Sequence, residues 1–175
     1  MEITKILEDA WKARNEGDYN TCLQLVQQAE AICDPEDLER LGRIQHIHMQ
    51  FHFDKDLYNE ALNYSRKSVD LYQKSGNQDR IAHSTRHMAD LELELGWLED
   101  AKAHYETALS IYRQMNPIPI RDLINCITHY AVLMEKMGRK EIALVCWSEA
   151  FAFYTQVEFE EGIKEAEENV NRLKG

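Results

Sequence analysis

Histidines are the side chains of this sequence with the clearest capacity for metal chemistry, and most of them fall into two groups. His46, His48 and His52 lie close together, and His83 and His87 are four residues apart. Two histidines at a spacing of four share one face of a helix and can hold one metal ion. However, no glutamate stands between them as in a zinc protease motif, and no cysteine cluster supplies further ligands. Because His48 and His52 also fall on a face expected to pack, we interpret the histidines as core or interface residues and predict no metal site and no cofactor.

Motifs for other kinds of catalysis are missing from the sequence. It has no glycine-rich phosphate loop, no dinucleotide fingerprint and no serine on a nucleophile elbow. The many carboxylates lie on predicted helix faces, where solvation and pairing with a lysine or arginine four residues away are the ordinary roles. We therefore predict that the protein is not an enzyme, and an enzymatic or metal-binding site built on the histidines remains a remote alternative.

The charge of the chain limits the class of partner. The 175 residues carry a formal net charge of -11 at pH 7, so a phosphate-neutralising surface for nucleic acid or an anionic membrane is not expected. No apolar run approaches the roughly 18 residues of a membrane span. The first residues lack the pattern of a signal peptide, and the four cysteines include no Cys-x-x-Cys pair. These features predict a cytoplasmic protein with reduced cysteines.

Four short segments with a glycine or aspartate at a break interrupt a helical pattern at regular intervals. Each precedes a small residue just inside the next helix, and these residues, Cys22, Ala61, Ala101 and Ala143, are 39, 40 and 42 positions apart. Between the breaks, apolar residues recur at steps of three and four, as in amphipathic helices. The pattern predicts helices at about residues 2–15, 19–32, 36–54, 58–74, 78–95, 98–115, 119–137, 140–156 and 159–173. A helix–turn–helix unit repeated at this period is typical of a solenoid.

Particular residues predict where helices begin and end. Asp34 is suited to an N-cap, with Pro35 at the first helical position. Gly76 is suited to a left-handed helix stop, with Asn77 as the cap of the next helix. The segment 116–119, Asn-Pro-Ile-Pro, cannot continue a helix, because proline lacks the amide hydrogen and clashes with the preceding turn. The last predicted helix, 159–173, has no hairpin partner and is expected to cap the array through a stripe of Phe159, Ile163, Ala166 and Val170.

The segment 95–109, Leu-Gly-Trp-Leu-Glu-Asp-Ala-Lys-Ala-His-Tyr-Glu-Thr-Ala-Leu, resembles the tetratricopeptide repeat family. The resemblance implies that Ala101 and Ala108 are the small packing positions, with Tyr105 between them. It implies an all-α fold, a right-handed α-solenoid of four hairpins at about 2–32, 36–74, 78–115 and 119–156 plus the capping helix 159–173, within a single domain of residues 1–175. The repeats are longer than the usual 34 residues, and Met49 stands where a small residue is expected.

The same resemblance implies that the first helix of each hairpin lines a concave groove. Steps of three and four along these helices give candidate binding residues: Trp11, Arg14, Arg43, His46, Gln50, Phe53, His83, Arg86, Asp90, Asn125 and Thr128. Donors gather at one end of the predicted groove: Arg43, His46, His83, Arg86 and Asn125. Guanidinium groups suit carboxylates, so an acidic peptide or chain terminus is one hypothesis, and simple solvation of a concave surface is the other.

The predicted function is therefore a non-enzymatic interaction module, an adaptor or scaffold that binds a peptide or a helix of a partner protein in the concave groove. A rigid curved array holds its side chains in place, so little ordering is needed in the receptor when an extended segment binds. Two alternatives remain open, a regulator that senses a peptide and acts on a partner protein, and a homo-oligomer formed by self-association.

Overall fold

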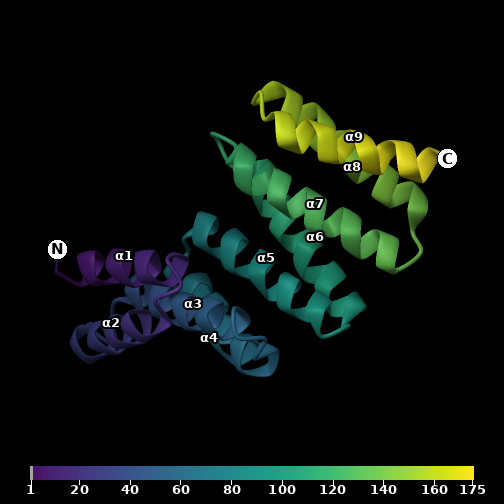
Figure 1. The fold of residues 1–175 in the computed structure, drawn as a ribbon. Helices are drawn as coiled ribbons and strands as arrows, with labels where there is room; N and C mark the ends of the chain where they lie inside the picture. Colours follow the sequence, from purple (N-terminus) through teal and green to yellow (C-terminus); the bar gives the residue numbers. More distant parts are fainter. Residues whose placement is uncertain (1) are drawn as a thin grey trace.

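The computed structural model describes residues 2–175, which form nine α-helices and no strand. The helices are α1 (Glu2–Asn15), α2 (Tyr19–Ile32), α3 (Leu38–Phe53), α4 (Tyr58–Ser75), α5 (Gln78–Glu94), α6 (Leu98–Gln114), α7 (Ile120–Lys136), α8 (Lys140–Gln156) and α9 (Glu160–Lys174). Successive helices pair as hairpins, α1 with α2, α3 with α4, α5 with α6 and α7 with α8, and α9 packs on α8. The hairpins are stacked along one direction, with the two ends of the chain at opposite ends of the array (Figure 1). The fold is the predicted α-solenoid.

The turns inside the hairpins share one backbone conformation, a residue with positive φ at the break. Gly96 has φ of 77°, a left-handed conformation that glycine adopts without steric cost, and Trp97 N donates to Glu92 O across the turn. In the second hairpin Asp56 holds the equivalent position with φ of 57°, since aspartate tolerates this region better than most residues. The prediction of a glycine or aspartate at each break is therefore confirmed.

The boundary before α3 differs from the prediction. The N-cap is Asp37, whose carboxylate accepts the Arg40 amide, and Pro35 lies in a turn outside the helix. Asp34 instead accepts the amide of Glu36, which closes a local turn. Both aspartates are good caps, so the local sequence did not distinguish them. The other two predicted breaks are confirmed: Gly76 has φ of 76° with Asn77 capping α5, and α7 begins at Ile120, directly after the second proline.

The buried apolar residues form three clusters along the array. One joins α1, α2 and α3, a second joins α3, α4 and α5, and the largest joins α5 through α9. The repeated small positions, Cys22, Ala61, Ala101 and Ala143, are all fully buried, which allows close approach of the paired helices. Met49 is also buried, so the second hairpin accommodates a long side chain where the family pattern expects a small one.

The terminal helix packs in part on the predicted stripe, since Ala166 is fully buried and Val170 packs against the largest cluster. Phe159 lies before α9 and remains 49% exposed, and the buried residues are Gly162, Ala166 and Leu173. At Gly162 a Cβ atom would lie 2.5 Å from Cε1 of Tyr154, so the missing side chain is what lets α9 approach α8. Among residues 2–175, none of the helices is both long and apolar enough to cross a membrane.

Candidate binding surface

Asp90 is the centre of a buried polar network on α5. Its carboxylate accepts hydrogen bonds from Arg86 Nη1 at 2.9 Å, from the Tyr105 hydroxyl at 2.7 Å and from His129 Nδ1 at 2.7 Å, and His87 Nδ1 lies 3.2 Å away. Burial alone would raise the pKa of Asp90, but the bonds from His129 and His87 and the charge of Arg86 outweigh it and hold that pKa well below the usual range. Arg86 is thus neutralised within the fold, so it is not a free donor for a ligand.

A cavity of about 410 Å³, here called the groove cavity, opens beside this network between α1, α3, α5, α6 and α7. Its lining residues are Arg14, Met49, Gln50, Phe53, Asp54, Arg86, His87, Asp90, Leu93, Glu94, Tyr105, His129 and Val132. Arg14 binds Asp54 through two bonds of 2.7 Å, which fixes one rim of the cavity. With the charges paired in this way, apolar side chains remain to contact a ligand, Met49, Phe53, Leu93 and Val132.

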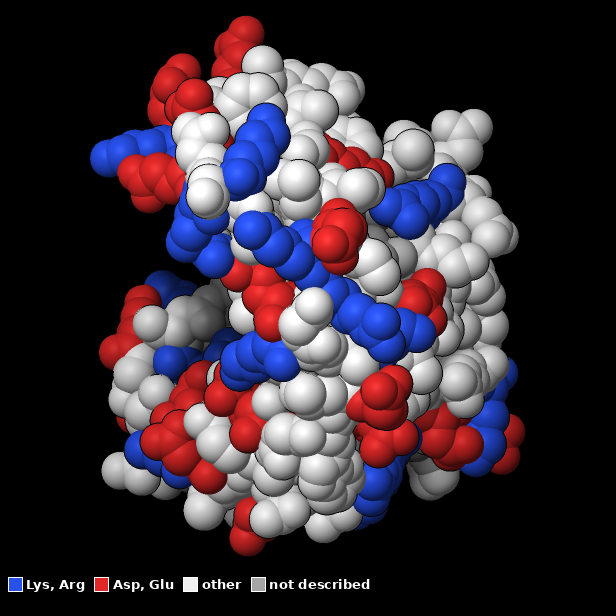
Figure 2. All heavy atoms as spheres, turned by 90° about the vertical axis from the view of Figure 1, so that its right-hand side faces the viewer, with Lys and Arg blue, Asp and Glu red and all other residues white. Residues whose placement is uncertain are grey.

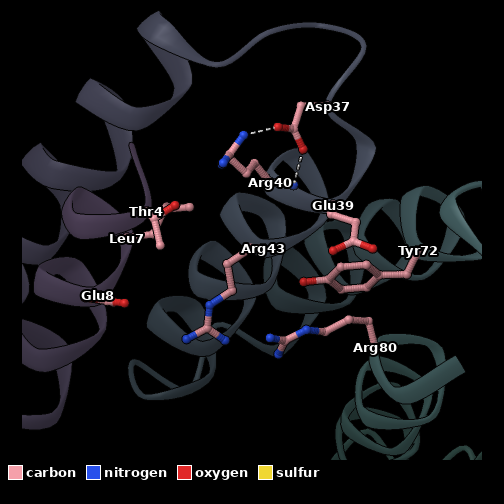
Figure 3. A pocket seen from close by; sticks show the side chains of 9 residues that line it. All are labelled: Thr4, Leu7, Glu8, Asp37, Glu39, Arg40, Arg43, Tyr72 and Arg80. Atoms are coloured by element: carbon pink, nitrogen blue, oxygen red, sulfur yellow. Dashed lines mark hydrogen bonds and ion pairs between the residues drawn. The ribbon is translucent and has the colours of Figure 1, made fainter. Parts of the chain in front are cut away.

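A second cavity of about 520 Å³, here called the arginine pocket, lies between α1, α3, α4 and the start of α5. Figure 3 shows the guanidinium groups of Arg43 and Arg80 turned toward each other, with the Tyr72 hydroxyl beside them. Within residues 2–175 neither Arg43 nor Arg80 forms an ion pair, whereas Arg40 at the rim is bound to Asp37. Burial lowers the pKa of Arg43, and the charges of the nearby Arg80 and Arg14 act in the same direction.

The charges elsewhere on the surface are mixed. Figure 2 shows lysine and arginine interspersed with aspartate and glutamate over the face that it presents. Several of these are paired along or between helices, such as Arg113 with Glu149 at 2.7 Å and Arg172 with Glu135 at 2.7 Å. Pairs of this exposed kind contribute little to stability and offer no unpaired charge to a ligand. Arg43 and Arg80 of the arginine pocket differ from these paired arginines.

Three histidines meet where the second hairpin faces the third. The ring centroids of His46 on α3 and His83 and His87 on α5 are 4.7–5.1 Å apart, and this triangle is here called the histidine cluster. His46 is 1% exposed, and neither of its ring nitrogens has a hydrogen-bond partner. Burial and the neighbouring His87 and His83 hold the pKa of His46 well below its ordinary value. Burial, with the adjacent Arg86, lowers the pKa of His87 to about 3, so the rings of His46 and His87 are neutral at pH 7.

His48 and His52 have the packing role predicted for them. The two rings lie at 4.7 and 4.8 Å from the ring of Tyr64 on α4, in stacked geometry. His48 is buried, with Nε2 3.2 Å from a carboxylate oxygen of Glu30, and His52 Nδ1 lies 2.7 Å from the carbonyl oxygen of His48. Both rings therefore pack inside the second hairpin, and His48 also reaches the first hairpin through Glu30 on α2.

The predicted groove residues do not form one continuous set. Arg14, Gln50, Phe53, Arg86 and Asp90 line the groove cavity, and Arg43 lines the arginine pocket. The predicted donor group of Arg43, His46, His83, Arg86 and Asn125 is wrong as a single site: His46 is buried, Arg86 is bound to Asp90, and Asn125 lines a separate cavity near the α8–α9 turn. Trp11 lines neither the groove cavity nor the arginine pocket, and Thr128 is buried, with its hydroxyl bound to the Asn125 carbonyl.

Arg80 and Tyr72 are the site residues that the sequence prediction missed. Arg80 lies three residues before His83, so the same helical stepping, extended by one turn toward the start of α5, reaches it. Tyr72 lies on α4, the second helix of its hairpin, and a rule confined to first helices cannot find it. The Tyr72 hydroxyl points to the same space as the two guanidinium groups (Figure 3). The second helix of a hairpin therefore also contributes to the pocket, which the prediction did not consider.

A buried ion pair inside the third hairpin makes a testable contribution to stability. His104 Nδ1 lies 2.6 Å from Oε2 of Glu92, which is 3% exposed, and this bond raises the pKa of His104. Because the pKa is higher in the folded state, the ion pair stabilises the fold fully at pH values below the unfolded pKa of about 6.5. This stabilisation is lost as the pH rises through the folded pKa. We expect His104→Gln to lower the free energy of unfolding by about 1 kcal/mol near pH 6, since His104 is one-third exposed, and by less near pH 9.

Urea unfolding of the wild type and His104→Gln at the two pH values measures this difference. A difference that is the same at both would show that His104 acts through packing alone.

Residues 41–114 match the family model of the tetratricopeptide repeat, which corresponds to α3 through α6. No curated protein matches the sequence significantly. Among solved structures, BtubC from P. vanneervenii has a TM-score of 0.75 and 14% identity over 99% of this chain and 87% of that one.

Two other similar structures are longer than this chain. Aspartyl phosphate phosphatase F from Bacillus subtilis has a TM-score of 0.85 and 13% identity, covering 95% of this chain and 43% of that one. The Rap conjugation gene regulator of plasmid pLS20, solved in complex with the Phr* peptide, has a TM-score of 0.74 and 15% identity, covering 98% of this chain and 47% of that one. This chain thus spans less than half of either protein, and at these identities the likeness concerns the fold. Residues 41–114 are therefore tetratricopeptide repeat sequence, and the chain folds as an α-solenoid of the tetratricopeptide repeat type.

Proposed function

We propose that this chain is a non-enzymatic interaction module that binds an acidic peptide, or an acidic segment of a partner protein, on its concave surface. The observation that carries the proposal is the arginine pocket, where Arg43 and Arg80 lie close together and neither forms an ion pair among residues 2–175. Glu8, Asp37 and Glu39 also line this pocket, and Asp37 is bound to Arg40 while Glu39 accepts a hydrogen bond from Asn77. Two cations brought together and partly desolvated are unfavourable unless an anion joins them. A carboxylate is the ligand that two guanidinium groups and a tyrosine hydroxyl would bind by direct hydrogen bonds.

The groove cavity supplies the second contact of this proposed interaction. On α3, Arg43 precedes Gln50 by seven residues, which separates the two cavities by about 10 Å along the helix. An extended peptide advances about 3.3 Å per residue, so an acidic residue in the arginine pocket would place an apolar one in the groove cavity about three positions away. A ligand of this pattern would bury Phe53 and Leu93 while its carboxylate binds Arg43 and Arg80.

The similar structures support this proposal at the level of the fold. The tetratricopeptide repeat is generally a non-enzymatic interaction fold, and the pLS20 Rap regulator was solved with a bound peptide. All four cysteines of the chain are unpaired, which agrees with the expected cytoplasmic location because reducing compartments keep thiols free. A peptide-sensing regulator of a partner protein is a finer form of the same proposal.

Selection from a displayed library of random peptides tests the chemistry of the ligand. We expect the chain to enrich peptides with an acidic residue about three positions from an apolar one. For an enriched peptide, Arg43→Ala and Arg80→Ala should each weaken binding roughly tenfold in fluorescence anisotropy, which corresponds to about 1.4 kcal/mol for a charged hydrogen bond. Replacing the acidic residue of the peptide by its amide should have a similar effect.

Arg113→Ala is the matched control, since Arg113 is already paired with Glu149 away from both cavities. Its affinity should equal that of the wild type. Enriched peptides that lack acidic residues, or full affinity in both pocket variants, would contradict the proposal.

Self-association is the second candidate. Val145 is 66% exposed and Ile142 is 43% exposed, and at a spacing of three residues they share one face of α8, which a second copy could cover. Light scattering of the wild type at two concentrations separates this alternative from the binding of a peptide.

A further inference from the structure

We propose that the histidine cluster is a binding site for a Zn²⁺ ion, held by His46 of the second hairpin and by His83 and His87 of the third. Imidazole is a preferred ligand of zinc, and three histidines with one open position form a known type of coordination sphere. The site would connect α3 to α5 directly, between the arginine pocket and the groove cavity. Its function would be to fix how the two hairpins that carry the proposed binding surface lie against each other.

The spacing of the three rings fits a tetrahedral site. Zinc–nitrogen bonds of about 2.0–2.1 Å place each ring centroid roughly 3 Å from the metal, so tetrahedral ligands have centroids roughly 5 Å apart. The observed separations are 5.1 Å for His46–His83, 5.0 Å for His46–His87 and 4.7 Å for His83–His87. Their ligand nitrogens lie within 4.8 Å of one another. A tetrahedral site needs roughly 3.3 Å between nitrogens, a change that small rotations of the rings can supply.

A carboxylate lies beside each of two of the rings, where metal-bound histidines usually have one. His83 Nδ1 lies 3.7 Å from Oδ1 of Asp122, and His87 Nδ1 lies 3.2 Å from Oδ2 of Asp90. A histidine that binds zinc commonly sets its other ring nitrogen against a carboxylate, which fixes the tautomer and strengthens the ligand. The Nε2 atoms of His83 and His87 are then the nitrogens left for the ion.

His46 gives independent evidence for a ligand at this position. Its ring is 1% exposed, and both nitrogens are without a hydrogen-bond partner in the described residues. A buried polar group without a partner is unfavourable, and native structures seldom contain one without a reason. A metal ion bound to one nitrogen of His46 would remove half of this deficit. The sequence did not predict this site because its three histidines come from two hairpins. His46 lies on α3, whereas His83 and His87 lie on α5.

Arg86 is the group that competes with the ion. Its Nη2 lies 2.7 Å from His87 Nε2, where it donates to the lone pair that zinc would use, and its Nη1 donates to Asp90. Metal binding must displace the contact of Arg86 with His87 Nε2, and it can keep the contact of Arg86 with Asp90. Because Arg86 is also a cation beside the site, its presence weakens the binding of a divalent ion. Arg86→Met is therefore expected to bind zinc more tightly than the wild type, a result that a structural role of the histidines does not predict.

Titration of the tag-free, chelator-treated chain with Zn²⁺ in a calorimeter tests the proposal, with Co²⁺ absorption as the measure of tetrahedral geometry. We expect one ion per chain. His83→Ala, which changes a partly exposed ring, and His46→Phe, which keeps a buried ring, should each weaken binding tenfold or more. Asp122→Asn should weaken it roughly tenfold by removing the orienting carboxylate.

His52→Gln is the control, since the His52 ring stacks on Tyr64, contacts no member of the cluster, and should leave the affinity unchanged. No bound ion in the wild type, or an affinity in His83→Ala equal to that of the wild type, would overturn the site. Equal affinity in the Arg86→Met variant would also count against it, provided that circular dichroism shows the variant to be folded.

Discussion

Asp90→Asn is expected to lower the free energy of unfolding by about 3–5 kcal/mol, because Arg86 is left as a buried cation without its carboxylate. Arg86 is 6% exposed, and Asp90 is its ion-pair partner within the described residues. Asparagine keeps the shape of aspartate, so the change removes charge and leaves the packing intact. Tyr105 and His129 would also exchange a charged acceptor for a neutral one, which adds to the loss. Urea unfolding followed by circular dichroism measures the effect.

The double variant Asp90→Leu with Arg86→Met separates the cost of an unpaired charge from the value of the pair. Apolar replacement of a whole buried ion pair is often neutral or stabilising. We therefore expect the double variant to be more stable than Asp90→Asn. Glu149→Gln, which breaks the exposed pair with Arg113, should cost about 1 kcal/mol or less. A loss below about 1 kcal/mol in Asp90→Asn would mean that water in the groove cavity solvates Arg86.

The sequence predicted the helices well because their signals are local. Apolar steps of three and four residues, together with Gly76, Gly96 and the prolines, mark each helix where it begins or ends. The exceptions occur where two residues satisfy the same local rule. Asp34 and Asp37 are both good N-caps, and the choice of Asp37 is visible only in the folded turn. At the C-terminus, the approach of α9 to Tyr154 selects Gly162 for burial, although a glycine adds nothing to an apolar pattern.

The candidate site was harder to predict because it depends on pairing between helices. Helical stepping placed Arg43 and Arg86 on equivalent faces of α3 and α5, and the one local difference is that Asp90 follows Arg86 by four residues, whereas Ile47 follows Arg43. What distinguishes them is the network at Asp90, whose partner His129 is 39 residues away on α7. Arg43 forms no ion pair among residues 2–175, although Glu39 lines the same pocket, so the charge that remains for a ligand lies in the arginine pocket. The histidine cluster was also hard to predict, because His46 comes from the second hairpin and His83 and His87 come from the third.

The three tryptophans differ in burial because they occupy different positions within the repeat. Trp11 and Trp97 are 43% and 41% exposed, whereas Trp147 is 2% exposed and donates from Nε1 to Glu135 at 2.9 Å. Trp147 follows the small residue Ala143 by four positions, as Tyr105 follows Ala101, and both aromatic rings are buried. Position within the repeat therefore predicts burial where the residue is inside the second helix. Trp97 precedes α6 as its N-cap and stays at the surface.

Trp147→Ala is expected to lower the free energy of unfolding by about 3–5 kcal/mol, the usual range for a buried tryptophan replaced by alanine. Trp147 belongs to the largest apolar cluster, which joins α5 through α9, and the clusters around α1–α4 do not include it. In an array whose hairpins contact only their neighbours, a loss at one end is not shared equally along the chain. Amide hydrogen exchange should therefore accelerate most in α7, α8 and α9 and least in α1 and α2.

Trp97→Ala is the control and should cost about 0.5 kcal/mol or less, as is usual for surface substitutions. Equal acceleration in all nine helices of residues 2–175 would instead show that the array unfolds as one cooperative unit, with the three clusters coupled through α3 and α5.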